Sequence, residues 1–259
     1  MPRLKLTVAY EGTRYEGWQL QTRRGEPPLT IQGELERALA HILGRRAPVH
    51  GAGRTDGGVH AEAQVCHVDI PARNVGVDWM QAVNMQLADD VRVLDVEWVD
   101  ESFHARRSAV GKRYAYTLWM GRHKAPPRLQ AFVWSCPALD WTRIAPTIPK
   151  LVGEHDFASF QNSGAKVAHT VRALRKVDIL PGHAANLVCP PDWPVVTLIF
   201  EGNGFLKQMV RNLVGLLVWV GQGKLSAQDI PAVMTAKNRR ALASPSAPAR
   251  GLTLLEVLY

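Results

Sequence analysis

One acidic residue, Asp56, stands near a base in a cluster of glycines. The stretch reads Gly51-Ala52-Gly53-Arg54-Thr55-Asp56-Gly57-Gly58-Val59-His60. Glycine allows backbone conformations that other residues avoid, and it lets neighbouring groups approach closely. The nearby arginine favours the ionised form of the carboxyl group. Such a carboxylate can act as a nucleophile, bind a metal ion or close an Asx turn, and this segment alone favours the Asx turn.

Other chemistries find less support in the same region. The spacing Gly51-x-Gly53-x-x-Asp56 is like a dinucleotide-binding fingerprint, but an aspartate takes the place of the third glycine and no amphipathic helix follows. A metal site built from Asp56, His60 and His67 is conceivable, yet histidines at such loop and strand spacings are more often structural. Hydrolase chemistry of the Ser-His-Asp type lacks a G-x-S-x-G turn.

A second candidate region combines aromatic and basic residues in Lys112-Arg113-Tyr114-Ala115-Tyr116. The alternation of a strand places Tyr114 and Tyr116 on one face and Arg113 on the other. Tyrosines on a strand usually belong to the core. Because bases flank them here, a platform on which an extruded RNA base stacks is the alternative.

A polar stripe marks the helix predicted over Phe205–Val220. Its members are Lys207, Gln208, Arg211 and Asn212, and helical spacing puts Lys207 and Arg211 one turn apart. A solvated helix face explains this stripe about as well as a site does. Arg211 on a rigid helix would nevertheless be a suitable cation for a distant carboxylate such as Asp56.

The charge balance of the 259 residues favours a polyanionic partner. Lys and Arg number 31 against 23 Asp and Glu, which gives a net charge of +8. Phosphate neutralisation supplies most non-specific affinity for nucleic acid, so RNA or DNA is the first candidate. A surplus of charge that merely keeps the surface soluble is the alternative. Arginine dominates the basic set, and it suits bidentate phosphate contacts and stacking on bases.

Cysteines and apolar runs indicate a reducing compartment. Cys66, Cys136 and Cys189 are far apart and form no C-x-x-C pair, so neither a disulfide framework nor a zinc ribbon is indicated, and Cys66 is interpreted as a small buried hydrophobe. The N-terminus has no apolar stretch typical of a signal peptide. The longest apolar run, Leu213–Val220, is too short to span a bilayer. We expect a cytoplasmic protein.

Hydrophobic periodicity indicates elements in two successive sets. Strands are predicted over 4–10, 63–70, 91–99, 111–120, 174–180, 195–200 and 252–259, and helices over 30–43, 77–87, 140–152, 205–220 and 226–237. Thr30 is the expected N-cap of the first helix, and Gly44 follows its end. This order predicts an α+β fold with a mostly antiparallel sheet. The predicted domains are 1–105 and 106–259, joined near Ala105-Arg106-Arg107.

Over nearly its whole length the chain resembles the TruA-type tRNA pseudouridine synthases. The segments that carry the resemblance follow in family order: Tyr10-Glu11-Gly12-Thr13 with Tyr15-x-Gly17-Trp18-Gln19, Gly53-Arg54-Thr55-Asp56-x-Gly58-Val59-His60, Phe103-His104-Ala105-Arg106, Lys112-Arg113-Tyr114-x-Tyr116, Gly153-x-His155-Asp156-Phe157 and Phe205-x-x-x-Met209-Val210-Arg211-Asn212. The chain departs from the family in two places. Gly57 stands where alanine is usual, and Lys207-Gln208 replaces a pair that commonly contains histidine.

The resemblance implies a role for each candidate residue. Asp56 would be the catalytic nucleophile, Tyr114 the tyrosine against the target uracil, and Arg211 the arginine that pairs with the catalytic carboxylate. Arg54 would help to displace the target base and hold its phosphate. Lys112 and Arg113, which flank the tyrosine, would join Arg54 and Tyr114 in binding the substrate.

The resemblance also implies the reaction and the architecture. Uridine would become pseudouridine at positions 38, 39 and 40 of the tRNA anticodon stem-loop, without a metal or an organic cofactor. Two similar halves, the first carrying the aspartate loop and the second the tyrosine strand and arginine helix, would join into a mixed, largely antiparallel sheet flanked by helices. A basic cleft would lie between the halves. The protein would be a homodimer that binds tRNA, and neither DNA nor a membrane.

Two other functions stay open at this point. A non-catalytic tRNA-binding or RNA-folding protein would show the same charge and aromatic residues, but it would not need Asp56 in a glycine-rich turn. A uridine glycoside hydrolase would need a second carboxylate for acid–base work, and the sequence offers no convincing partner for Asp56. The sequence also leaves open whether the nucleophile attacks the sugar or the base, or whether the reaction begins with elimination.

Overall fold

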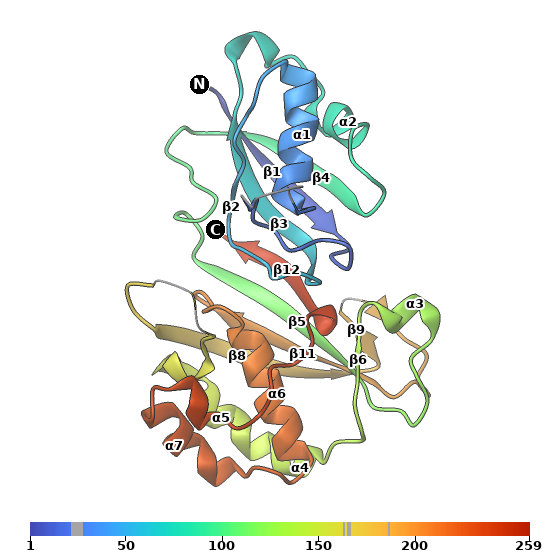
Figure 1. Ribbon diagram of the computed structural model, residues 1–259, viewed down its shortest axis with the longest axis vertical. Helices are drawn as coiled ribbons and strands as arrows, with labels where there is room; N and C mark the ends of the chain where they lie inside the picture. The colour runs from blue at the N-terminus through green and yellow to red at the C-terminus, as the bar shows by residue number, and fades with distance from the viewer. Residues whose placement is uncertain (22–27, 163, 165–166, 186) are drawn as a thin grey trace. The chain divides into compact units, whose positions relative to one another are not determined.

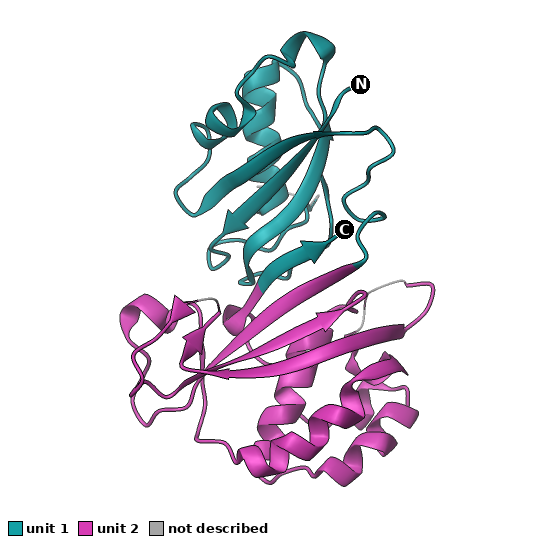
Figure 2. Cartoon of the chain, turned by 180° about the vertical axis from the view of Figure 1, so that it is seen from behind, with its two compact units in different colours: residues 1–110, 254–259 teal, residues 111–253 magenta. Residues whose placement is uncertain are grey.

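The computed structural model describes residues 1–21, 28–162, 164, 167–185 and 187–259, and these form two compact units. Unit 1 comprises Met1–Val110 with Leu254–Tyr259, and unit 2 comprises Gly111–Thr253 (Figure 2). The division therefore falls after Val110 rather than at the predicted join after residue 105. The end of the chain belongs to unit 1, whereas the sequence assigned it to the second domain.

The core of unit 1 is a sheet with the strand order β4-β1-β3-β12 (Figure 1). Its strands are β1 (Arg3–Tyr10), β3 (His60–Asp69), β4 (Val91–Val99) and β12 (Leu252–Leu258), and the short β2 (His50–Gly51) pairs with β3. Both β3 and β4 run antiparallel to β1. Alternate residues of β1 are buried, as expected for a strand with one face on the core. Cys66 is buried in β3, which raises the pKa of its thiol.

The helices of unit 1 lie against this sheet. Helix α1 (Ile31–Leu43) begins where predicted, because the Thr30 hydroxyl accepts a hydrogen bond from the Gly33 amide, and it ends at Gly44 with φ 67°. Helix α2 (Trp79–Asn84) is shorter than the predicted 77–87. Its last side chain, Asn84, donates to the Val93 carbonyl and accepts from the Val93 amide, both at 2.8 Å, which ties the helix end to β4.

Unit 2 has a mixed sheet with the strand order β5-β11-β8-β7. The strands β5 (Gly111–Trp119), β11 (Val195–Gly202), β8 (Val171–Pro181) and β7 (Gly153–Asp156) run antiparallel to their neighbours, whereas β6 (Trp134–Ser135) runs parallel to β5. A separate two-stranded ladder joins β9 (His183–Ala184) to β10 (Leu187–Val188). The predicted α+β class is confirmed in both units.

Helix α6 is the central helix of unit 2, and most of its residues are buried. It covers Met209–Gly221, whereas the sequence predicted a start at Phe205. Gln208 has φ 61°, a left-handed conformation that interrupts helical continuation. Lys207 therefore lies in the turn before the helix, and the predicted one-turn spacing between Lys207 and Arg211 is wrong.

Unit 2 also contains four smaller helices among its described residues. They are α3 (Pro127–Gln130), α4 (Trp141–Ile144), α5 (Ile148–Leu151) and α7 (Ile230–Thr235). The predicted helix over 140–152 is divided into α4, a 3₁₀ turn and α5, because Pro146 and Pro149 each remove a backbone donor and prevent one continuous helix. No helix in the described part of the chain is long and apolar enough to cross a bilayer.

Candidate active site

Asp56 lies in the turn that leads into β3, and its side chain is partly exposed. Backbone contacts fix the turn at both ends. The Ala52 amide donates to the Val65 carbonyl at 2.7 Å, and the Val59 amide donates to the Asp56 carbonyl at 3.2 Å. Asp56 also forms an isolated bridge with Gly17. The carboxylate is thus attached to a backbone that is bound at several points.

The segment 12–18 forms a second turn that supports the Asp56 turn. The Trp18 amide donates to the Thr55 carbonyl at 3.1 Å, and the Gly58 amide donates to the Tyr15 carbonyl at 3.2 Å. Gly17 has φ 101°, and a Cβ there would lie 2.5 Å from the Thr55 carbonyl oxygen. The close approach of the two turns therefore requires glycine at position 17.

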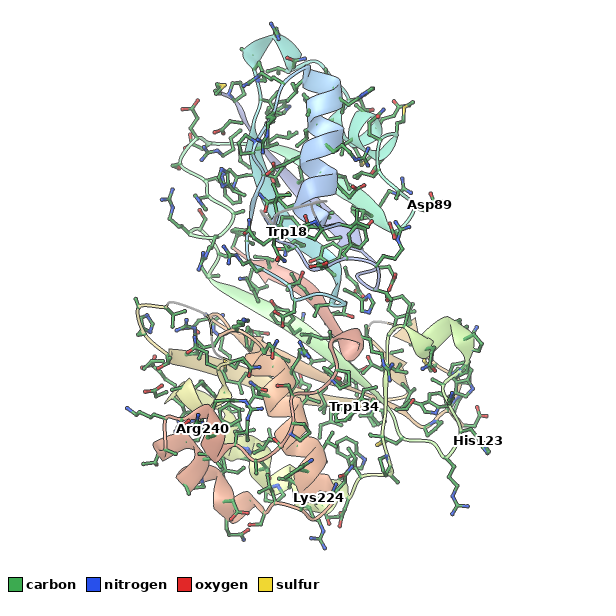
Figure 3. All side chains as sticks on the ribbon, in the orientation of Figure 1. Trp18, Asp89, His123, Trp134, Lys224 and Arg240 are labelled. Atoms are coloured by element: carbon green, nitrogen blue, oxygen red, sulfur yellow. The ribbon has the colours of Figure 1, made fainter. Side chains whose placement is uncertain are left out.

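Two buried aromatic side chains, Tyr10 and Trp18, pack beneath the surface of unit 1 at the two turns. The Tyr10 and Thr55 hydroxyls lie 2.9 Å apart, and burial raises the pKa of Tyr10. Trp18 is 2% exposed, and a Cβ on Gly51 would come within 2.5 Å of its ring. Figure 3 shows Trp18 inside unit 1 near the beginning of α1. Tyr10, Trp18 and Thr55 of the first two family segments thus belong to the packing around the turn of Asp56.

Arg54 is exposed beside this turn. Its Nε donates to the Gln19 side-chain oxygen at 3.0 Å, which orients the guanidinium group. Gln19 belongs to the first family segment, but the sequence alone gives it no role. The structure places it as the residue that positions Arg54.

The two histidines that sequence spacing offered as metal ligands have backbone partners instead. His60 is buried, and its Nδ1 accepts a hydrogen bond from the Gly12 amide at 3.0 Å. His67 is buried in β3, and its Nδ1 accepts from the Ala105 amide at 3.2 Å. These contacts give both rings a structural role. Among the residues that the structure describes, no group of three or more His, Cys, Asp or Glu side chains could hold a metal ion.

In unit 2, the two tyrosines of β5 have different surroundings. Tyr116 is fully buried, and its hydroxyl donates to the Pro248 carbonyl at 2.8 Å. Tyr114 is 8% exposed, and its ring meets that of Phe205 edge to face, with the centroids 5.2 Å apart. Tyr116 is therefore a core residue. Tyr114 lies at the margin of the core, and little of its ring reaches solvent while Phe205 covers it.

The bases that flank Tyr114 lie opposite the end of β11. Lys112 pairs in register with Gly202, and Arg113 pairs with Glu201. The Arg113 Nε lies 3.7 Å from a Glu201 carboxylate oxygen. The Glu201 carboxylate is thus an acidic neighbour of Arg113 across the two strands.

Arg211, near the start of α6, is held by a segment that the sequence analysis did not single out. Its Nε donates to the Ala247 carbonyl at 2.7 Å, and the Ala247 amide donates back to the Arg211 carbonyl at 3.0 Å. A Cβ on Gly215 would lie 2.0 Å from the Pro245 carbonyl oxygen, so α6 and this segment are in close contact. The run Ser244-Pro-Ser-Ala-Pro248 consists of turn-forming residues and alanine and carries no chemical motif.

Asn212 shows that the predicted polar stripe of α6 is not a solvated face. Its side chain is fully buried and donates to the Phe160 carbonyl at 2.7 Å and to the Asn162 amide oxygen at 3.0 Å. Asn162 also donates to the Gln208 side chain. Asn212 thus stabilises the packing of α6, whereas Arg211 is partly buried and Lys207 is exposed.

Unit 1 brings together Asp56, Arg54 and Gln19, and unit 2 contains the other candidates: Lys112, Arg113, Tyr114 and Arg211. Within unit 2, Tyr116 links β5 to the segment around Ala247 that holds Arg211. Its hydroxyl bonds to Pro248, beside Ala247, and the positive charge of Arg211 lowers the pKa of Tyr116 against the larger rise caused by burial. Strand β5 and helix α6 are therefore both bonded to the same segment, at Ala247 and Pro248.

Comparisons with known proteins place the chain beside one group of RNA-modifying enzymes. The family model described as "tRNA pseudouridine synthase" matches residues 6–106 and 148–259, ranges that contain Asp56 and Arg211. The protein called tRNA pseudouridine synthase A of Lawsonia intracellularis is 47% identical, and the alignment covers 100% of both chains. The proteins of that name from Nitratidesulfovibrio vulgaris strain Hildenborough and Geobacillus kaustophilus are 45% and 37% identical, over 100% and 99% of this chain and 97% and 94% of theirs.

Proposed function

Because this chain belongs to the tRNA pseudouridine synthase family, we propose that it converts uridine to pseudouridine at positions 38, 39 and 40 of the anticodon stem-loop. The family is one of isomerases, so no atoms are gained or lost in the reaction. One observation carries the proposal for the site. Asp56 lies on a turn whose backbone is fixed by the 12–18 segment, and its side chain still reaches solvent.

Asp56 is the proposed nucleophile. The reaction breaks the glycosidic bond of uridine and forms a new bond between the same sugar and a carbon of the base. The reacting group must keep its place while the base turns, and a backbone held at Gly17 and Gly58 provides such a place. The nucleophile must also stay ionised when RNA covers the site and excludes water.

Arg211 is the proposed cation for Asp56. Removal of water from a carboxylate disfavours its charged form, and a nearby guanidinium offsets that cost. The bonds between Arg211 and Ala247 hold the arginine through both its side chain and its backbone. A fixed cation of this kind loses little freedom when it meets its partner.

Arg54 and Tyr114 are proposed to handle the extruded nucleotide. Extrusion of a base from a stem-loop costs a few kcal/mol of stacking and pairing. A phosphate contact from the exposed Arg54 offsets part of this cost, and Lys112 and Arg113 add to it. Tyr114 can replace a lost stacking neighbour once Phe205, which lies in a turn outside the regular elements, moves from its ring.

The remaining parts of the proposal concern the setting of the reaction. The protein would act in the cytoplasm as a homodimer and would bind tRNA in a basic cleft, without a role for DNA or a membrane. The net charge of +8 supports a polyanionic substrate. The rival function, a non-catalytic tRNA-binding protein, shares this charge but predicts no conversion of uridine.

The substitution Asp56→Asn tests the assignment. It keeps the shape of the side chain but removes the nucleophile, so pseudouridine formation in tRNA should be abolished while the affinity for tRNA stays nearly unchanged. Turnover is measured by release of the proton from uracil C5, affinity by equilibrium binding, and the modified positions by mapping. Residual turnover within about tenfold of wild type, or about 1.4 kcal/mol of barrier, would contradict the assignment.

A further inference from the structure

A small lobe of unit 2 carries a hydrophobic cluster of its own beyond the end of β5. This distal lobe consists of the described residues of 120–135 and 181–194, and it includes α3, β6, β9 and β10. Its cluster is formed by Trp119, Ala125, Leu129, Val133, Ala184, Cys189 and Val195, with Trp193 packed against it. Figure 1 shows this lobe on the side of unit 2 away from α5 and α7.

The turn at 121–124 presents exposed basic side chains from a fixed backbone. The Trp119 indole donates to the His123 carbonyl at 2.8 Å, and the Met120 amide donates to the Pro194 carbonyl at 2.7 Å. Arg122, His123 and Lys124 are exposed on this turn, and Figure 3 shows His123 at the outer margin of unit 2. The buried indole thus holds the turn while its side chains point into solvent.

Arg128 extends this basic surface. Its guanidinium carbon lies 4.9 Å from the centroid of the Trp193 ring, and the residue is exposed. A guanidinium on an aromatic ring keeps its donors at the edge of the plane, where they can bind phosphate oxygens in pairs. The aromatic ring also reduces the rotamer freedom that binding would otherwise remove.

The charge of the distal lobe is not compensated locally. Its described residues hold three Lys or Arg side chains, those of Arg122, Lys124 and Arg128, and their acidic counterpart is Asp192. Within the described residues, no carboxylate oxygen lies within 4.0 Å of those three basic side chains, whereas Arg3 and Arg37 elsewhere each bind a carboxylate. Positive side chains without carboxylate partners on an ordered turn suit a polyanion.

The lobe begins beyond Trp119, the last residue of β5. Trp119 is five positions after Tyr114 along the strand, or about 17 Å at about 3.3–3.4 Å per residue. A phosphate bound at the lobe therefore belongs to a part of the RNA other than the nucleotide at Tyr114. The turn also falls within 107–147, between the two ranges matched by the family model.

We propose that the distal lobe is a second RNA-contact surface, which binds backbone phosphates of the tRNA body outside the anticodon stem-loop. The proposal rests on the proposed function for the identity of the RNA. It assigns Arg122, Lys124 and Arg128 to substrate affinity and not to chemistry. In the helical parts of the tRNA body such a contact acts on shape and charge, because side chains cannot read the deep major groove of an RNA helix.

The test compares two RNA substrates with one variant. The triple variant Arg122→Ser, Lys124→Ser, Arg128→Gln leaves the hydrophobic cluster intact. With full-length tRNA, its KM should rise on the order of tenfold at unchanged kcat, and the slope of log affinity against log salt should become shallower by about two to three. With an isolated anticodon stem-loop, KM should equal that of wild type.

A matched control removes the same charge from the helical side of unit 2. The variant Lys150→Ser, Lys224→Ser, Arg143→Gln changes exposed residues near α4, α5 and α6, and it should leave KM for full-length tRNA unchanged. Thermal unfolding of both variants confirms that each is folded.

Three results would overturn the proposal. The first is an unchanged KM for full-length tRNA in the lobe variant, which would direct attention to a protein partner for the exposed pair Leu187 and Val188. The second is an equal rise in KM for the stem-loop. The third is an equal loss in the control variant. If wild-type protein converts neither RNA, the proposed function fails, and equilibrium binding of the two RNAs still tests the lobe.

Discussion

At the scale of single residues, backbone hydrogen bonds of its neighbours hold the turn that carries Asp56. The Thr55 and Tyr15 carbonyls accept hydrogen bonds across the two turns, and Gly17 allows them to approach. The close approach of the two turns therefore depends on glycine at position 17.

Substitution of alanine for Gly57 or for Gly17 should show which of the two glycines the folded turns require. Gly57 has no left-handed backbone, and a Cβ there would lie 3.3 Å from the Tyr15 carbonyl oxygen, so Gly57→Ala should change the free energy of unfolding by less than about 1 kcal/mol. Gly17→Ala places a Cβ 2.5 Å from a backbone oxygen at φ 101° and should cost about 2 kcal/mol or more. Urea unfolding measures both, and equal losses would contradict this account of the turn.

Tyr114 offers the second test at this scale. Tyr114→Phe keeps the ring and its edge-to-face contact with Phe205, whereas Tyr114→Leu removes the stacking surface. If stacking on the uracil is the main role, the Phe variant should retain substantial turnover and the Leu variant should lose on the order of a hundredfold, in line with about 1–3 kcal/mol per stacked base. Single-turnover assays at saturating enzyme measure this difference. Inactivity of both variants with intact tRNA binding would assign the role to the hydroxyl, and full activity of the Leu variant would remove Tyr114 from the site.

At the scale of elements, sequence patterns were sufficient where one local signal decided the outcome. Helix α1 begins after Thr30 and ends at Gly44 as predicted, because capping is a local interaction. The β4 strand also has its predicted bounds. The start of α6 was wrong because a left-handed Gln208 has no sequence signal, and the end of α2 depends on a bond from Asn84 to β4.

The candidate site was predictable to a different extent. Strand alternation placed Tyr114 and Tyr116 on the same face and could not tell which of them is a core residue. The structure distinguishes them because Tyr116 bonds to Pro248, which is far away in the sequence. The choice of Asp56 over an ordinary Asx turn came from the family resemblance. The roles of Gln19 and Ala247 depend on tertiary contacts, so no pattern in the sequence could show them.

The junction between β3 and the segment before β5 should be sensitive to acid. Burial is the main reason that the pKa of His67 is lowered to about 4, with Arg3, His104 and His50 adding to the effect while Asp69 opposes it. As pH falls through about 6.5 the unfolded chain binds a proton that folded His67 does not bind until about pH 4. The free energy of unfolding should therefore decrease across that window and remain constant above it.

Urea unfolding at pH 7.5, 6 and 5 measures this decrease. The variant His67→Gln does not titrate, so its free energy of unfolding should depend less on pH than that of wild type. The pKa of His104 is also lowered, mainly by burial, and His104→Gln serves as the comparison that separates the two rings. An identical pH dependence in wild type and His67→Gln would exclude His67 as the cause.

At the scale of the whole molecule, the net charge of +8 predicts recognition driven by phosphate neutralisation. With on the order of five to eight phosphate contacts, the affinity for tRNA should fall by a few orders of magnitude between low and moderate salt, and its logarithm should fall linearly with that of the salt concentration. Asp56→Asn should keep the slope, and Arg54→Ala should make it shallower. Filter binding across a salt series measures the slopes, and an affinity that barely responds to salt would refute an electrostatic contribution from Arg54 and its neighbours.

Because Leu254–Tyr259 belong to unit 1, unit 1 cannot complete its fold until unit 2 has been synthesised. Tyr259 donates to the Ala105 carbonyl at 2.8 Å, and Lys5 lies over its ring, so residues made after unit 2 contact residues made before it. Until the ribosome has made all of unit 2, β3 lacks its neighbour β12, and the edge of β3 beyond its short pairing with β2 stays open. A nascent chain that carries the aspartate turn must therefore wait for its final strand, and stalled or truncated products should be prone to aggregation and proteolysis.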